Sequence, residues 1–221
     1  MTQNRKDELR ENLSHVENQI SQALFDADRN RDDLTLVVVT KTYPVEDALF
    51  LYELGVRDFG ENRDHEGALK APALPNDARW HFQGQIQSRK ISSISSWSSV
   101  VHSLDSLEHA AKFSQRADSS VTDFFLQVSM EPSLEHRGGI PVDEIDDFLA
   151  RSPLHISGLM VVPPLEKKAS EVFSVLAQEA THRGLPFLSM GMSGDFVEAI
   201  KAGATHIRVG SSILGSRPPL T

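Results

Sequence analysis

The chain has 221 residues, with 31 acidic against 22 basic side chains and a formal net charge of −9. This acidic balance argues against a nucleic-acid partner, because phosphate backbones select basic surfaces. The sequence has no cysteine, which excludes disulfides, thiolate metal sites and a cysteine nucleophile. No stretch reaches the roughly 18 apolar residues that span a bilayer, and the polar first residues lack a signal peptide's apolar core. We therefore expect a cytoplasmic protein without a membrane partner.

The first predicted element is an amphipathic helix over residues 7–29. Its apolar positions recur at spacings of three and four residues: Leu9, Leu13, Val16, Ile20 and Leu24. A continuous β-branched run follows at 34–40, and such a run is typical of a buried parallel strand.

From residue 34 onward, short apolar segments alternate with longer amphipathic ones. The predicted strands are 34–40, 57–60, 80–83, 99–103, 123–129, 155–160, 186–189 and 206–209. The predicted helices are 45–54, 61–70, 86–94, 106–116, 142–151, 166–183, 193–202 and a weaker one after 211. Parallel strands need crossover helices, so the pattern predicts a single (β/α)8 TIM barrel over residues 1–221, preceded by an extra helix. An open doubly wound sheet is the alternative.

Lys41 is the first candidate site residue, because it directly follows the strand 34–40. In a barrel the carboxyl ends of the strands form the active face. A partly desolvated lysine there would have a free amine lone pair for attack on a carbonyl. The alternative is a lysine that extends its ammonium group into solvent.

Two small-residue turns follow the seventh and eighth predicted strands. The first contains Ser193 and the second contains Gly210, Ser211 and Ser212. At these positions of a barrel, backbone N–H groups at helix starts and serine hydroxyls commonly bind a phosphate. A reactive lysine facing a phosphate site suggests one ligand that carries both an aldehyde and a phosphate, namely pyridoxal 5′-phosphate (PLP). Arg208 could reach the ring nitrogen of that ligand, or could instead pair with a carboxylate inside the barrel.

The same residues belong to segments that resemble the pyridoxal phosphate homeostasis protein family. The segments are Val-Val-Thr-Lys at 38–41, Phe-Gly-Glu-Asn at 59–62, Trp-His-Phe-Gln at 80–83, Ser-Met-Gly-Met-Ser at 189–193 and Arg-Val-Gly-Ser at 208–211. The resemblance covers nearly the whole chain in order, and it implies a barrel like the N-terminal domain of alanine racemase.

The resemblance also implies a role for each matching residue. Lys41 would form an internal aldimine with PLP, and Arg208 would face the pyridine nitrogen. The full set of cofactor-binding residues implied in this way is Lys41, Asn62, His81, Met190, Ser193, Arg208, Gly210 and Ser211. Asn62 and His81 would line the mouth of the pocket, and Met190 would lie beside the ring. The sequence departs from the family pattern at 63–65, at Gln85 and at 137–139, which leaves a second lysine-dependent role of the 131–139 loop in doubt.

The implied function is a PLP carrier or buffer that releases the cofactor to apoenzymes and has no catalytic residue. An arginine beside the ring nitrogen opposes its protonation and weakens the electron sink that PLP enzymes use. A racemase also needs a second base, and the only tyrosines are Tyr43 and Tyr52. The alternatives are a weak PLP-dependent, racemase-like enzyme and a PLP-free barrel with a Schiff-base lysine.

The remaining polar residues suggest less. The nine histidines show no metal-ligand spacing, so we expect no metal. His102 and Asp105 could be a catalytic pair or a structural one. With no large apolar stripe left over after the core helices, we expect a monomer.

Overall fold

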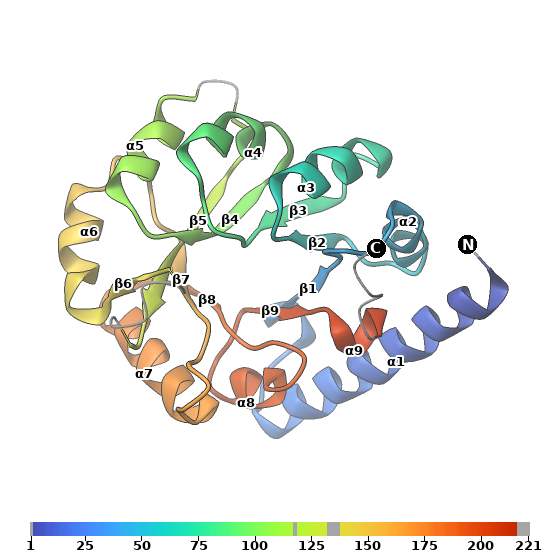
Figure 1. Ribbon diagram of the computed structural model, residues 1–221. Coiled ribbons are helices and arrows are strands. Elements are labelled where there is room, and N and C mark those ends of the chain that lie inside the picture. The colour runs from blue at the N-terminus through green and yellow to red at the C-terminus, as the bar shows by residue number, and fades with distance from the viewer. Residues whose placement is uncertain (1, 117–118, 132–137, 216–221) are drawn as a thin grey trace.

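Eight parallel strands close into a barrel in the computed structural model, which describes residues 2–116, 119–131 and 138–215 (Figure 1). The barrel strands are β1 (Thr35–Val39), β2 (Asp58–Glu61), β3 (Arg79–Phe82), β4 (Val100–Leu104), β5 (Asp123–Ser129), β7 (Gly158–Val161), β8 (Phe187–Ser189) and β9 (His206–Val209). Each pairs with its neighbour in chain order, and the β1–β9 pairing closes the ring. The predicted TIM barrel is confirmed, and the open sheet is excluded.

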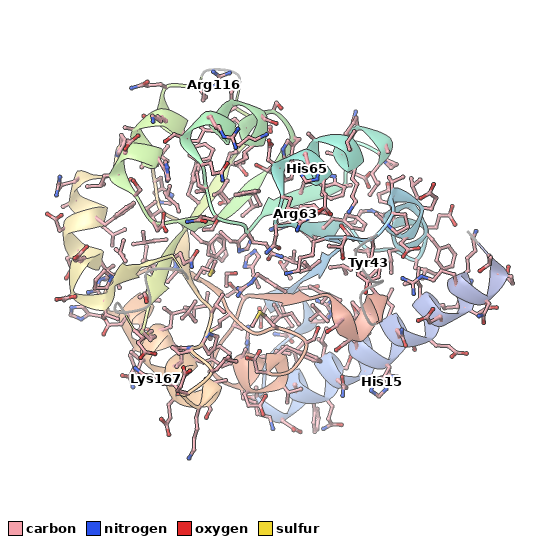
Figure 2. All side chains as sticks on the ribbon, in the orientation of Figure 1. His15, Tyr43, Arg63, His65, Arg116 and Lys167 are labelled. Atoms are coloured by element: carbon pink, nitrogen blue, oxygen red, sulfur yellow. The ribbon has the colours of Figure 1, made fainter. Side chains whose placement is uncertain are left out.

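Helices surround the barrel on the outside (Figure 1). They are α1 (Gln3–Asp26), α2 (Val45–Glu53), α3 (Asp64–Lys70), α4 (Ile91–Trp97), α5 (Leu107–Ser114), α6 (Ile145–Arg151), α7 (Ala169–His182), α8 (Phe196–Lys201) and α9 (Ser211–Leu214). The extra leading helix is α1, which packs along α8 and α9 and buries the five apolar residues that predicted it. His15 lies on its exposed face (Figure 2). No helix among the described residues is long and apolar enough to cross a membrane.

Alternate residues of each strand face opposite sides of the barrel wall, which gives the protein two kinds of core. The outward side chains and the helices form one large apolar cluster that includes Phe59, Trp80 and Phe82. Inside the barrel, the apolar cluster of the described residues consists of Val100, Phe125 and Met160, and Val37 and Val39 are further buried apolar residues that lie outside the large cluster. Buried polar side chains, among them His81, His102, Ser189 and Arg208, also lie in the interior.

Several element boundaries differ from the sequence prediction by a few residues, and two differences are larger. A two-residue strand, β6 (Ile140–Pro141), pairs with the end of β5 and was not predicted. The helix expected at 86–94 begins instead at Ile91, after a 3₁₀ turn over Ser88–Lys90. Short elements of this kind depend on tertiary pairing and capping, so apolar periodicity does not reveal them.

Candidate functional site

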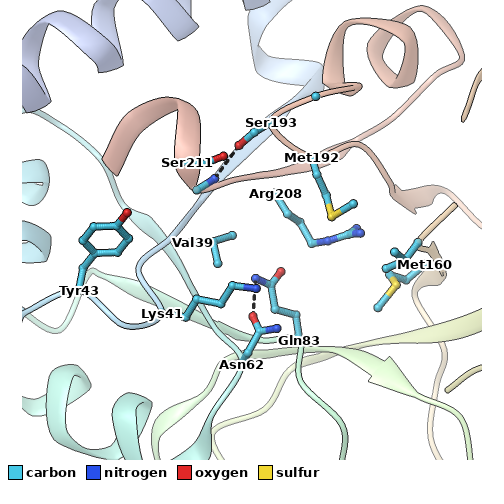
Figure 3. A pocket seen from close by; sticks show the side chains of 13 residues that line it. Val39, Lys41, Tyr43, Asn62, Gln83, Met160, Met192, Ser193, Arg208 and Ser211 are labelled. Carbon is cyan, nitrogen blue, oxygen red and sulfur yellow. Dashed lines mark hydrogen bonds between the residues drawn. The ribbon is translucent and has the colours of Figure 1, made fainter. Parts of the chain in front are cut away.

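A cavity of about 250 Å³ opens at the carboxyl ends of the barrel strands (Figure 3). Its walls come from the ends of β1, β2, β3, β7, β8 and β9. The lining residues are Val39, Lys41, Tyr43, Asn62, Gln83, Met160, Val162, Met192, Ser193, Gly194, Arg208, Gly210 and Ser211. This set contains two cationic side chains and no carboxylate, so the cavity suits an anionic ligand.

Lys41 enters the cavity from the loop after β1, with its amine directed towards Asn62 and Gln83 (Figure 3). The loop is fixed on both sides of the lysine. Thr40 is fully buried, and the backbone N–H of Thr42 donates to Glu66 Oε2 at 2.6 Å. Thr42 has a φ of +69°, a conformation that β-branched residues rarely adopt, so tertiary contacts must hold the turn in place.

A buried ion pair lies behind this loop and completes its support. Glu61, at the end of β2, accepts from the hydroxyl of Thr40 and from Lys70 Nζ, both at 2.6 Å. Lys70 Nζ also donates to the carbonyl of Thr40 at 2.8 Å. Burial raises the pKa of Glu61, while Lys70 acts in the opposite direction. This pair could not be predicted from the sequence, because residues nine apart meet only when α3 folds back onto β2.

The two serine-containing turns meet above the cavity. Ser193 Oγ accepts from the backbone N–H groups of Gly210 and Ser212, each at 3.3 Å. Two backbone donors therefore converge on one oxygen atom, which is the arrangement that an anionic oxygen requires. Gly210 permits the close approach to β1, because a Cβ there would lie 3.2 Å from the carbonyl oxygen of Val39. These residues fit a phosphate group.

Arg208 forms the opposite wall of the cavity from the end of β9. Its side chain is almost fully buried and donates from Nη1 to Ser189 Oγ at 2.6 Å and from Nη2 to the carbonyl of Val161 at 3.0 Å. Burial lowers the pKa of the Arg208 guanidinium to about 10, while Asp195 acts in the opposite direction. Within the described residues the hydrogen bonds of the Arg208 guanidinium go to a hydroxyl and a backbone carbonyl and to no carboxylate, so the expected alternative of a carboxylate partner is wrong.

The structure brings six of the eight predicted cofactor-binding residues into this cavity and places two elsewhere. His81 lies inside the barrel beneath the cavity and is fully buried, so it does not line the mouth as expected. Met190 is also fully buried, but within the large apolar cluster between barrel and helices. Both residues belong to family-like segments, but motif membership does not tell which side of the wall, or which height in the barrel, a side chain occupies.

Several other assignments change with the structure. Gln83, Met160 and Met192 line the cavity but were not predicted; the signal available was the two-residue alternation along each strand.

His102 Nδ1 contacts Ser189 Oγ at 2.7 Å, so the suggested pairing with Asp105 is wrong. Asp105 instead accepts from the N–H of Gly139. Most of the 131–139 loop lies outside the described residues. No group of three or more metal-ligating side chains suited to a metal ion occurs in the described ranges.

Comparisons with known proteins bear on the family and the fold. No family model matches the chain. The chain is 41% identical to the pyridoxal phosphate homeostasis protein of Corynebacterium glutamicum over 220 residues, which cover 90% of this chain and 97% of that protein. PipY of Synechococcus elongatus, solved with PLP bound, has a TM-score of 0.77 and 28% identity, over 94% of this chain and 100% of PipY. Alanine racemase of Clostridium difficile has a TM-score of 0.72 over 96% of this chain and 57% of its own, with 16% identity, a likeness of fold alone.

Proposed function

Because this chain belongs to the pyridoxal phosphate homeostasis protein family, we propose that it binds PLP in the cavity at the carboxyl end of the barrel and serves in intracellular PLP homeostasis. The observation that carries the proposal is the opposition of Lys41 to the paired serine turns across one cationic cavity (Figure 3). An amine and a phosphate site on facing walls match the aldehyde and the phosphate of PLP.

Each wall of the cavity has a distinct task in this proposal. Lys41 would present the primary amine that condenses with the aldehyde carbon, with release of water. Ser193, Gly210 and Ser211 would hold the phosphate through hydroxyl and backbone donors at the start of α9. Arg208 would donate to the ring nitrogen. When bound, PLP supplies an electrophilic aldehyde and an electron-withdrawing ring.

We further propose that the protein carries and releases PLP without efficient turnover. A cationic guanidinium beside the ring nitrogen disfavours protonation of that nitrogen and so weakens the electron sink. A second proton-transfer group is also missing from the described walls. Tyr43 borders the cavity, but its hydroxyl donates to the carbonyl of Gly215 at 2.7 Å. Tyr52 is turned towards Asp77 on the outside of the protein.

The carrier proposal includes apo PLP-dependent enzymes as recipients and a monomeric, single-domain, cytoplasmic protein. The monomer is supported by the distribution of the most exposed large apolar side chains of the described residues: Phe25 lies on α1, Leu69 on α3 and Leu165 in the loop between β7 and α7. Light scattering of the purified protein would detect a dimer and refute the monomer.

The test of function separates carrying from catalysis. Loaded protein is incubated with D- and L-amino acids in deuterium oxide, and exchange at Cα is followed; in parallel, PLP transfer to an apoenzyme is measured against a free-PLP control. We expect activation of the apoenzyme and negligible exchange. Exchange at about 1 per second or faster would support the racemase-like alternative and overturn the carrier proposal. Activation no faster than the free-PLP control would also overturn it.

A further inference from the structure

A continuous chain of hydrogen bonds runs inside the barrel from beneath the cavity towards the amino ends of the strands. Arg208 Nη1 donates to Ser189 Oγ at 2.6 Å, and this hydroxyl lies 2.7 Å from His102 Nδ1. His102 Nε2 lies 2.8 Å from His81 Nδ1, and His81 Nε2 lies 2.9 Å from Asp58 Oδ1. Ser189, His102 and His81 are nearly or fully buried, whereas the side chain of Asp58 is 20% exposed.

The chemistry of the two ends fixes the direction of every proton between them. A guanidinium can only donate, and an ionised carboxylate can only accept. Burial raises the pKa of Asp58, but the hydrogen bond from His81 and the nearby charge of Arg79 act in the opposite direction and the pKa is lowered overall, so the carboxylate stays ionised. Burial lowers the pKa of both His81 and His102, so both imidazoles are neutral.

With both imidazoles neutral, only one assignment satisfies all four contacts. Asp58 requires a proton on His81 Nε2, which leaves His81 Nδ1 as an acceptor for His102 Nε2–H. His102 Nδ1 is then an acceptor for the hydroxyl proton of Ser189. Ser189 has no proton left to offer, so its oxygen can only accept from Arg208. All protons in the chain therefore point from the cavity towards Asp58.

The surroundings preserve this arrangement. Phe125 stacks on the ring of His102 with a centroid separation of 4.6 Å and nearly parallel planes, which restricts rotation of that ring. The other charged or titratable groups that face the two imidazoles from the adjoining strands are Arg79, Asp123 and His206. Burial lowers the pKa of His206 to about 3, so this neighbour adds no positive charge at neutral pH.

We propose that Ser189, His102 and His81 are positioning residues that present Arg208 to the cavity as a fixed, charged hydrogen-bond donor, and so make the protein select ligands whose ring carries an unprotonated nitrogen. The inference rests on the proposed function, which assigns Arg208 to the ring nitrogen. It adds a cause for that selectivity, located in side chains that never touch the ligand. Two guanidinium nitrogens are fixed by Ser189 and Val161, and the remaining N–H groups are left for the ligand.

The test compares two ligands on matched variants. One ligand is PLP, and the other is 1-deazapyridoxal 5′-phosphate, in which a C–H group replaces the ring nitrogen. Ser189→Ala breaks the hydrogen-bond chain next to Arg208. Ser95→Ala is the control, because Ser95 is equally buried on α4 and its hydroxyl has no hydrogen-bond partner among the described residues. His102→Phe breaks the hydrogen-bond chain one residue further from Arg208 and keeps an aromatic ring stacked on Phe125.

We expect Ser189→Ala to lower PLP affinity about tenfold, because Arg208 is no longer held in place to donate its charged hydrogen bond to the ring nitrogen. The deaza analogue cannot accept this hydrogen bond, so its affinity should stay within about twofold of the wild-type value. His102→Phe should act in the same direction, and Ser95→Ala should change neither affinity. An equal fall for both ligands, or no fall for PLP, would overturn the proposal.

A ligand-free measurement distinguishes failure of this inference from failure of the proposed function. Two-bond ¹H–¹⁵N spectra at neutral pH should show His81 and His102 both as neutral Nε2–H tautomers. Detection of an Nδ1–H tautomer or an imidazolium at either residue would overturn the proton direction, whether or not PLP binds. Absence of PLP binding by the wild-type protein, with these tautomers in place, would refute the proposed function instead.

Discussion

Acidification from about pH 7.5 to pH 5.5 should destabilise the protein through histidines buried in the barrel. Burial lowers the pKa of His206 to about 3 and holds the pKa of His102 well below its ordinary value. In the unfolded chain a histidine titrates near about 6.5. Below that pH the unfolded state therefore binds protons that the folded state cannot, and stability falls as the pH falls.

The magnitude follows from proton linkage. Over two pH units centred on the unfolded pKa, a histidine that stays neutral in the folded state loses about 1.4 kcal/mol of stabilisation. His102 and His206 together therefore account for about 3 kcal/mol. His81, whose pKa burial also lowers, adds to this loss. Glu61 and Asp195 oppose it, because burial raises their pKa values and the folded state takes up their protons earlier.

The assay is urea unfolding of the ligand-free protein at about pH 7.5, 6.5 and 5.5. His206→Gln should reduce the pH-dependent loss by about 1.4 kcal/mol. His15→Gln is the matched control, since His15 is exposed on α1, and it should keep the wild-type slope (Figure 2). A free energy of unfolding that does not change with pH, or an equal slope in His206→Gln and wild type, would refute the reasoning.

Three further predictions concern the cavity and its support. Ser193→Ala should lower PLP affinity about ten- to a hundredfold by calorimetry and leave pyridoxal binding unchanged, because only PLP carries the phosphate; equal losses for both ligands would contradict the assignment. Lys70→Met leaves Glu61 without its cationic partner and should cost about 3–5 kcal/mol of unfolding free energy in urea; a cost below about 1 kcal/mol would show that the pair does not support the Lys41 loop. Gly84→Ala should destabilise the protein by about 1–3 kcal/mol or more in the same assay, because its Cβ would lie 1.8 Å from the carbonyl oxygen of Asn62; wild-type stability would mean that this close approach is not rigid.

The barrel could be predicted because its signals are local. Each strand is a short apolar run, each helix has a repeating apolar face, and eight alternations leave few topologies open. The same reason allowed prediction of the main site residues, since each ends or follows a predicted strand: Lys41, Arg208 and the serine turns. The position of a residue at a strand end already tells on which face of a barrel it lies.

The interior of the barrel could not be predicted in this way. His81 belongs to a distinctive segment, but its height in the barrel depends on the register between β2 and β3, where Gly60 lies beside His81. The contact between His102 and Ser189 joins residues 87 positions apart, and no spacing rule connects them. Polar pairs that form only after the barrel has closed have no periodic sequence pattern that would predict them.

The most direct test of the central claim is to locate the covalent attachment of PLP. The loaded protein is reduced with borohydride, which makes the bond between the amine and the aldehyde carbon permanent, and its peptides are mapped by mass spectrometry. Lys201→Ala, which removes an exposed lysine on α8, controls for nonspecific labelling. We predict a pyridoxyl group on Lys41 in the wild-type protein and in Lys201→Ala, and its loss in Lys41→Ala. A pyridoxyl group found only on another lysine would contradict the account.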